Sequence, residues 1–321
     1  MGRVLALFTK CINSTLRFLR KYIKLLIPAV LLICLIIFVS FDYFLQIRIL
    51  SLRVSEPPFA SLPLAQYPVL DKTGIPDISA QAAIIMDRDS KVVLYAKNAD
   101  LRFSPASTTK IMTAYTALQY FDLSNILTVK REIDTQGSGL NLFKGEKMDV
   151  KNLLAGALIY SANDAAFTIS QNYPGGDDGF VAKMNENARL LHLSETHFGD
   201  PAGLLDSEDY TTARELVRLA SIAMQNAVFA KIVATPYATI ISADGQYKYF
   251  IKNRNTLLGS YGVNGIKTGY TDEAGEVLVT STILRGRTYY IVVMKSQDRF
   301  ADTWQLLNLL VNNTTFVSMH P

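Results

Sequence analysis

The stretch SPASTTKIMTAYTALQYF, residues 104–121, combines a helix signal with two side chains that can react together. Apolar residues recur at helical spacing between positions 111 and 118, which predicts a helix with one buried face. Ser107 and Lys110 stand at its start, and residues three apart on a helix share a face, about 5–6 Å apart at Cβ. A serine hydroxyl needs a base to become a nucleophile, and a lysine can be that base only if its amine is neutral.

The same pair has a plainer interpretation. A chance Ser-x-x-Lys is expected in a chain of this size, with the serine acting as a helix cap and the lysine in solvent. For catalysis the pKa of Lys110 would have to fall from about 10.4 toward 7, which burial or a second nearby cation can cause. Other motifs in the sequence are needed to distinguish a catalytic pair from a helix cap with a solvated lysine.

The segments around this helix predict strands at both ends of the folded region and helices between them. Apolar runs at 82–87 and 91–97 predict one hairpin, and Asp244-Gly245 and Arg285-Gly286 mark the turns of two more. The further helices predicted by their periodicity cover 149–160, 177–193, 211–225 and 298–313. This order favours an α+β body whose N- and C-terminal strands share one antiparallel sheet, with flanking helices and an inserted helical lobe.

The N-terminus predicts a membrane anchor. Residues 1–24 hold six basic residues and no acidic one, and residues 25–41 carry no charge. Extended to residue 45, the apolar run is about long enough to cross a bilayer, and its basic flank should stay in the cytoplasm. A cleaved signal peptide is the alternative, but no small-x-small site follows the run.

The expected organisation is a basic cytoplasmic segment at 1–24, a transmembrane anchor at 25–45, a proline-rich stalk at 46–77 and a catalytic domain at 78–321. Five of the eleven prolines lie in the stalk, which favours an extended chain, although a strap on the domain surface is also possible. The protein is therefore expected in the cell membrane as a single-pass protein, with its catalytic domain outside the cytoplasm.

Charge and cysteine content argue against a nucleic-acid-binding protein and against a domain held by disulfides. Outside the basic head, 26 basic residues stand against 28 acidic ones, so nothing points to a nucleic-acid partner. The two cysteines, Cys11 and Cys34, lie in the head and the anchor, so the exported part can form no disulfide.

Two later motifs, like the pair of Ser107 and Lys110, are weak evidence for a catalytic site when each is taken alone. In YSANDAAF, Ser161 and Asn163 lie between two predicted helices and could point into one cleft, but both are also common helix caps. In NGIKTGYTDEAG, Lys267 would supply a second cation, and Gly269 would let a ligand lie close to a strand. An edge strand with a solvated lysine is the plainer interpretation of that segment.

In this order Ser-x-x-Lys, Ser-x-Asn and Lys-Thr-Gly are the set shared by penicillin-binding proteins and class A β-lactamases. From about residue 80 to about residue 310 the chain resembles the D-alanyl-D-alanine carboxypeptidases, the low-molecular-mass penicillin-binding proteins of serine peptidase family S11. The resemblance is carried by NADLRFSPASTTKIMTAYTAL, LIYSANDAA, THFGDPAGL, IKNRNTLL and GVNGIKTGYTDEAG. It implies the β-lactamase/transpeptidase-like fold, and an enzyme that removes the terminal D-alanine from peptidoglycan stem peptides ending in D-Ala-D-Ala. β-Lactam antibiotics would be its covalent inhibitors.

The resemblance also implies catalytic roles. Ser107 would be the acylated nucleophile and Lys110 its general base. Ser161 would relay a proton toward the leaving amine, and Asn163 would hold the substrate amide.

The Lys-Thr-Gly segment would bind the substrate. Lys267 and Thr268 would meet its terminal carboxylate with the help of Arg254, and Gly269 would keep the strand open to it. The backbone N–H groups of Tyr270 and of the nucleophile would form the oxyanion hole. No cofactor is implied, and no metal-binding spacing is present.

Several alternatives remain. A D,D-endopeptidase acting on cross-links needs the same machinery, because fold and motifs do not decide the substrate. A β-lactamase would add a deacylating Glu-x-x-Leu-Asn, which is missing between the second and third motifs. A non-catalytic wall-binding protein and a Ser-His-Asp hydrolase are weaker, since the motifs are complete and His192 and His197 lie far from the serine in sequence. Glu276 stands where family members often carry an aromatic residue, which we expect to change one wall of the site.

Overall fold

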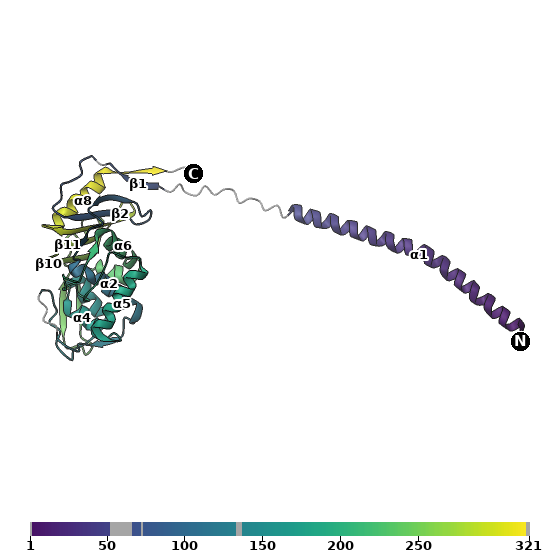
Figure 1. The fold of residues 1–321 in the computed structure, drawn as a ribbon, viewed down its shortest axis with the longest axis horizontal. Helices are drawn as coiled ribbons and strands as arrows, with labels where there is room; N and C mark the ends of the chain where they lie inside the picture. Colours follow the sequence, from purple (N-terminus) through teal and green to yellow (C-terminus); the bar gives the residue numbers. More distant parts are fainter. Residues whose placement is uncertain (1, 52–65, 72, 133–136, 319–321) are drawn as a thin grey trace. The chain divides into compact units, whose positions relative to one another are not determined.

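The computed structural model describes residues 2–51, 66–71, 73–132 and 137–318, and it divides into two units at residues 64 and 65 (Figure 1). The first unit is the helix α1, Gly2–Ser51, with Pro28 inside it. Its segment Tyr22–Arg48 is long and apolar enough to cross a membrane, and the anchor predicted at 25–45 lies within this segment. The division of the chain into anchor, stalk and catalytic domain stays a prediction.

The structure differs from the predicted stalk at both of its ends. Residues 46–51 continue α1, whereas 66–70 form strand β1, Gln66–Leu70, which pairs with β13, Thr314–Ser318. Residues 52–65 of the stalk lie outside the described residues. Pro68 is tolerated because β1 is an edge strand that pairs with a single strand, the distant C-terminal β13.

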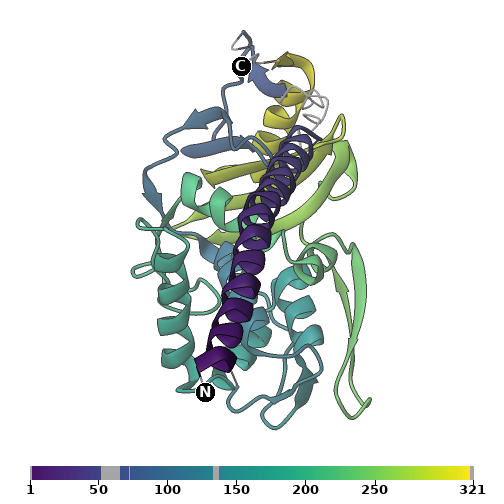
Figure 2. The same cartoon turned by 90° about the vertical axis from the view of Figure 1, so that its right-hand side faces the viewer.

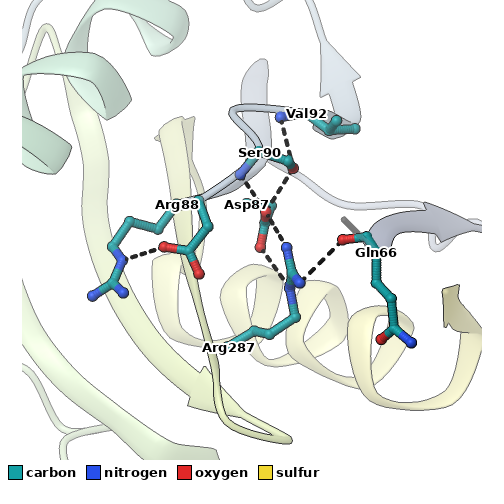
Figure 3. Close-up of polar contacts among 7 residues, drawn as sticks. Gln66, Asp87, Arg88, Ser90, Val92 and Arg287 are labelled. Atoms are coloured by element: carbon teal, nitrogen blue, oxygen red, sulfur yellow. Dashed lines mark hydrogen bonds and ion pairs between the residues drawn. The ribbon is translucent and has the colours of Figure 1, made fainter. Parts of the chain in front are cut away.

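A buried ion pair attaches β1 to the main sheet (Figure 3). Asp87 is fully buried and accepts from Arg287 Nη2 at 2.8 Å and from Ser90 Oγ at 2.6 Å. The same guanidinium donates through Nη1 to the carbonyl of Gln66 at 3.2 Å. Strands from both ends of the body are thus held by one arginine.

One five-stranded antiparallel sheet organises the second unit, in the order β10-β11-β12-β2-β3. Its strands are β2 Ala82–Asp87, β3 Val93–Lys97, β10 Val263–Thr271, β11 Gly275–Leu284 and β12 Arg287–Ser296. The turns at Arg88-Asp89-Ser90 and at Arg285-Gly286 lie where the sequence predicts them. The sharing of one sheet by strands from both ends is confirmed, and it leaves β10 as an edge.

Both faces of this sheet are covered, which is why β2 is buried along its whole length. On one face Ile84 packs with the helical lobe, including α2 and α6. On the other, Ile85 packs with the leucines of the C-terminal helix α8, Arg299–Asn313. Figure 2 shows the sheet between α8 and the larger group of helices. This agrees with an α+β body holding an inserted lobe.

The lobe contains most of the described helices and six short strands that form three pairs. Its helices are η1 Ala106–Thr109, α2 Lys110–Tyr120, α3 Val150–Ala155, η2 Gly156–Tyr160, α4 Asn163–Gln171, α5 Gly176–Leu190, α6 Ala213–Ala223 and α7 Ala227–Val233. Its strand pairs are β4 Arg102–Phe103 with β7 Thr211–Thr212, β5 Ile126–Thr128 with β6 Lys147–Asp149, and β8 Tyr237–Ile241 with β9 Lys248–Lys252. Asp149, the first residue of the helix predicted at 149–160, is the N-cap of α3 and accepts from the backbone of Asn152, whereas the short α7 was not predicted.

Candidate active site

Ser107 lies in a tight turn that precedes the buried helix rather than in the helix itself. The turn η1 is a 3-10 helix capped by Pro105, and Ala106 before the serine has a positive φ of 47°. Helix α2 then begins at Lys110, whose Nζ lies 2.8 Å from Ser107 Oγ. In a 3-10 turn residues three apart nearly eclipse each other, so this local geometry brings the two side chains together.

Lys110 is fully buried, and its polar partners are not carboxylates. Nζ donates to Asn163 Oδ1 at 2.7 Å and to the carbonyl of Ala202 at 2.8 Å. Burial lowers its pKa from 10.5 to about 7, although the charges of Asp200 and two further aspartates oppose this. A neutral amine has two N–H bonds and one lone pair. The two carbonyl oxygens can take both N–H bonds, which leaves the lone pair for the proton of Ser107.

Ser161 is placed by an unusual helix end. The π-helical turn η2 ends at Ser161, which is left-handed with φ 69° and ψ 27°. A non-glycine residue pays roughly 1–2 kcal/mol for this conformation, so the surrounding packing must enforce it. Its Oγ accepts from Lys267 Nζ at 2.8 Å, and the same Nζ donates to the carbonyl of Thr268 at 2.8 Å.

The two buried lysines influence each other differently from the prediction. Lys267 was expected to make Lys110 neutral, but burial is the leading cause of the lowered pKa of Lys110. The pKa of Lys267 lies well below its usual value because of burial first and the charge of Lys110 second, followed by Arg299 and Arg254. The cleft therefore disfavours two ammonium groups at once.

Asn163 begins helix α4 and connects it to a loop of the cavity. Its backbone N–H donates to the carbonyl of Ser138 at 2.8 Å. The next residue, Asp164, accepts from the backbone of Leu140 at 2.8 Å and of Leu142 at 3.1 Å. The start of α4 thus holds both the amide side chain and the loop that faces it.

Strand β10 reaches the nucleophile because Gly269 has no side chain. A Cβ at this position would lie 3.0 Å from the carbonyl oxygen of Pro105 and 3.2 Å from the backbone nitrogen of Ser107. The edge of the sheet therefore packs directly against η1, and Thr268 and Tyr270 on either side of Gly269 both line the cavity. The glycine thus admits η1, whereas the predicted close approach of a ligand to the strand stays a prediction.

These elements enclose an open cavity of about 200 Å³. Its lining residues are Ser107, Gly137, Ser138, Ser161, Asn163, Leu204, Arg254, Thr268, Gly269, Tyr270 and Arg299. Every predicted site residue belongs to this lining except Lys110 and Lys267, whose amines lie behind the two serines. Lys267 was predicted to contact a substrate carboxylate directly. Arg254 and Arg299 line the cavity and could make this contact instead.

Arg299 was missed by the sequence analysis. It is the first residue of α8, and its Nη1 donates to the carbonyl of Gly269 at 2.7 Å. Its Nε is buried without a partner among the described residues, so it has a free donor near the cavity. Glu276, expected in a wall of the site, instead accepts from the backbone of Arg299 at 2.8 Å and is not among the lining residues described.

A second missed group shapes the loop that faces Ser107. Asp200 accepts four backbone N–H bonds, from residues 202–205, at 2.5 to 2.8 Å. The resulting turn presents the carbonyl of Ala202 to Lys110. Gly203 within it cannot be replaced easily, because φ is +78° and a Cβ would lie 1.9 Å from the carbonyl oxygen of Ala106. The motif GDPAGL contained this signal, since Asp, Pro and Gly are turn residues and occur here within four positions.

Asp206 joins the two segments that flank the cavity. Its Oδ1 accepts from Ser104 Oγ at 2.5 Å, on the segment that leads to the nucleophile, and from Thr271 Oγ1 at 2.8 Å, at the end of β10. No sequence pattern marked it, because its partners lie 102 and 65 residues away.

The two histidines that the structure describes, His192 and His197, take no part in this arrangement. His197 Nδ1 lies 3.0 Å from the carbonyl of Glu208 and its ring stacks on Tyr210, while His192 lies two residues after α5 with a φ of 56°. Among the described residues, no group of three or more His, Cys, Asp or Glu side chains could hold a metal ion. His320 lies outside the described residues.

Comparisons with known proteins agree with this geometry. A family model described as Peptidase S11, D-alanyl-D-alanine carboxypeptidase, matches residues 70–298. The chain is 34% identical over 222 residues to D-alanyl-D-alanine carboxypeptidase DacF of Bacillus subtilis (strain 168), a match covering 67% of this chain and 57% of that relative. It is 31% identical over 264 residues to the D-alanyl-D-alanine endopeptidase of Pseudomonas aeruginosa, covering 80% and 82%.

The crystal structure of the Streptomyces K15 DD-transpeptidase is similar with a TM-score of 0.69 and 32% identity, covering 73% of this chain and 98% of that one. This likeness confirms the predicted fold class.

Proposed function

The chain belongs to the D-alanyl-D-alanine carboxypeptidases of peptidase family S11, which are serine-type hydrolases, and we propose that it removes the terminal D-alanine from peptidoglycan stem peptides through an acyl-enzyme. One observation carries this proposal: the amine of Lys110 lies 2.8 Å from Ser107 Oγ, is fully buried, and has a pKa of about 7. Such an amine can accept a proton at neutral pH without any histidine.

Acylation would begin when Ser107 passes its proton to Lys110 and attacks the carbonyl between the two D-alanines. The backbone N–H groups of Ser107 and Tyr270 would bind the oxygen that becomes negative. Each such donor typically lowers the barrier by about 2.7–4 kcal/mol. The contact between η1 and Gly269 supports this pairing, because it brings the two backbone segments together.

The leaving D-alanine needs a proton on its nitrogen. Ser161 would supply it, and Lys267 in its protonated form would replace that proton through the 2.8 Å contact between Nζ and Oγ, while the proton of Ser107 stays on Lys110. Asn163 would meanwhile bind the substrate amide, since its side-chain oxygen is already engaged by Lys110 and its NH₂ group can still donate.

The free carboxylate of the substrate would bind the cationic end of the cavity. Thr268 and the guanidinium groups of Arg254 and Arg299 line that end. Arginine suits a carboxylate because its donors form a planar fork. Lys267, buried behind Ser161, would contribute positive potential there when it is protonated.

Cleavage of cross-links is a second candidate, and one observation favours it. The match to the P. aeruginosa relative named D-alanyl-D-alanine endopeptidase covers 82% of that protein, against 57% of DacF. An endopeptidase would need room beyond the cavity for the second peptide, while the catalytic residues would be the same.

Two experiments test the proposal. Ser107→Ala should abolish covalent labelling by a fluorescent penicillin, and labelling that persists would remove Ser107 as the nucleophile. Incubation of the full chain with a pentapeptide stem and with a cross-linked dimer, read by mass spectrometry, separates the two activities. Loss of one alanine from the pentapeptide supports the carboxypeptidase, and cleavage of the dimer alone supports the endopeptidase.

We also propose that the enzyme acts at the outer side of the cell membrane, anchored by α1. The support is the apolar segment Tyr22–Arg48 and the excess of basic residues before it. Mass spectrometry of the mature protein would decide the matter, because an N-terminus near residue 45–60 would mean that the segment is cleaved.

A further inference from the structure

The β8–β9 hairpin has one face packed in the core and one face in solvent. Ile240 and Ile251 are buried. Tyr237, Thr239 and Ile241 of β8 and Lys248, Phe250 and Lys252 of β9 are exposed on the other face. Figure 2 shows the hairpin as the light-green ribbon extending along one side of the helical lobe.

This outer face is unusually apolar for an exposed surface. Phe250 is 81% exposed, more than any other large apolar side chain that the structure describes, and Tyr237 is 66% exposed. Exposed aromatic side chains that gather on one surface commonly mark an interaction site. Nothing among the described residues forms a second layer over this face.

The face is also positively charged. Lys248 and Lys252 lie on it, and Lys252 Nζ stands 5.9 Å from the centre of the Tyr237 ring. Between residues 237 and 252 the sequence has one acidic residue, Asp244, and its carboxylate is engaged by Ser242 at the turn. A ligand that fits this face would therefore combine apolar or sugar surface with negative charge.

The exposed side chains of β9 lead toward the cavity, which Arg254 lines from a bend two residues after the strand ends. Exposure alternates from Lys248 through Phe250 and Lys252 to Arg254, which lines the cavity. Side chains two apart on an extended chain point to the same side. From Lys248 to Arg254 the distance is about 20 Å, at about 3.4 Å per residue.

Two asparagines keep this row aligned with the cavity. Asn253 Nδ2 donates to the carbonyls of Val233 and Thr235, at 3.1 and 3.0 Å. Asn255 Nδ2 donates to the carbonyl of Gly265 at 3.1 Å, at the start of β10. Because both asparagines point inward, the residue between them points outward to the cavity.

We propose that the outer face of the β8–β9 hairpin is a docking track for the polymeric substrate, which contacts the carboxylate-bearing stem peptides and glycan next to the peptide held in the cavity. The proposal rests on the proposed function, which supplies an anionic polymer as the substrate. A short peptide ending in D-Ala-D-Ala fills the cavity alone, because the track leads about 20 Å away from it. The track therefore distinguishes polymer from soluble peptide.

The test compares two substrates with the full chain in detergent micelles. The substrates are a short D-Ala-D-Ala peptide and purified peptidoglycan sacculi that carry pentapeptide stems. The variants are Lys248→Glu/Lys252→Glu and Phe250→Ser. The matched control reverses two charges elsewhere, Lys183→Glu/Arg189→Glu on α5.

For the double lysine variant we expect turnover of sacculi to fall about tenfold, with turnover of the short peptide within about twofold of the unmodified chain. The loss should shrink at high salt, because screening weakens contacts between exposed charges. Phe250→Ser should lower sacculus turnover without changing the salt dependence. The control variant should turn over both substrates normally.

Equal turnover of sacculi by the variants and the unmodified chain would overturn the track. So would an equal loss on both substrates, which would mean damage to the cavity. If the lysine variant no longer binds anionic lipid vesicles but its turnover of sacculi is unchanged, the face would instead be a membrane-binding surface. If Phe250→Ser converts a dimer to a monomer while sacculus turnover is unchanged, the hairpin face would instead bind a second copy of the chain.

A binding readout separates this proposal from the proposed function. The Ser107→Ala chain is sedimented with sacculi, with and without the hairpin substitutions. If the unmodified chain cuts no substrate but the lysine variant still lowers sedimentation, the proposed function fails and the track stands. If the unmodified chain cuts the peptide and sedimentation is unchanged in the lysine variant, the track fails and the function stands.

Discussion

The rate of acylation should follow the titration of a single buried amine. Lys110 Nζ contacts Ser107 Oγ, and burial lowers the pKa of this lysine from 10.5 to about 7. Only the neutral amine can take the serine proton. Raising the pH from 5 to 9 therefore converts Lys110 from an inactive ammonium group to an active base.

The expected magnitude follows from the two pKa values. With a pKa of about 7, about half of Lys110 is neutral at pH 7, about a tenth at pH 6 and about nine tenths at pH 8. A solvated lysine would be neutral in only about one molecule in 3,000 at pH 7. Burial thus increases the active fraction by about 1,500-fold, which is within the range of enzymatic acid–base effects.

The assay is the second-order rate constant for acylation by a fluorescent penicillin, measured by stopped flow from pH 5 to 9. We expect a rise of about tenfold per pH unit below 7 and a plateau above 8. Lys110→Arg is the control, because a guanidinium stays charged and should not support acylation at any of these pH values. A flat profile, or a midpoint above about 9, would refute the neutral lysine as base.

Four further outcomes are expected. Lys110→Met should raise the melting temperature at pH 7, measured by the fluorescence of Trp304. The lowered pKa of Lys110 corresponds to about 5 kcal/mol of destabilisation of the folded chain, and the variant removes it. Part of this gain is lost because the oxygens of Asn163 and Ala202 lose their hydrogen-bond donor. This gain should fade as the pH rises toward 10.5, since the unfolded lysine then also loses its proton, and an unchanged melting temperature at pH 7 would contradict it. Arg299→Ala should lower kcat/KM about 10- to 100-fold for a peptide with a free carboxylate but not for its C-terminal amide, and equal losses on both would remove the carboxylate role. Asp206→Ala should slow acylation about tenfold with little change in the initial binding of penicillin, whereas weaker binding at an unchanged rate would argue against positioning of the flanking segments. Gly203→Ala should prevent penicillin labelling, because its Cβ has no room, and normal labelling would show that the turn can move.

Much of the fold follows from patterns that are short in sequence. The hairpin turn at Arg285-Gly286, the continuous apolar run of β2 and the helix from Lys110 depend on neighbouring residues, so local physics predicts them. The strap β1 does not, because its hydrogen bonds come from β13, more than 240 residues later. A proline-rich segment predicts extended chain but not the strand against which it lies.

The site residues also divide into those that neighbouring sequence predicts and those that only tertiary packing brings to the cavity. Ser107 and Lys110 are three residues apart, so their contact could be inferred from a helical turn alone. Arg299 gave no signal, because at the sequence level it is only the start of a helix, and its contact with Gly269 depends on how α8 packs beneath the sheet. Glu276 was expected in a wall of the cavity from its place in the family pattern, and its carboxylate instead accepts from the backbone at the start of α8.

The order of the motifs by itself determined the chemistry of this protein, since serine, lysine, asparagine and Lys-Thr-Gly together specify acyl transfer without histidine. The tertiary structure alone decided the energetics of that chemistry. In the proposed mechanism Lys110 can act as a base because it is fully buried against Asn163 and Ala202, and both lie more than 50 residues away. A pKa depends on the dielectric surroundings and the charges nearby, and these are properties of packing that no local sequence contains.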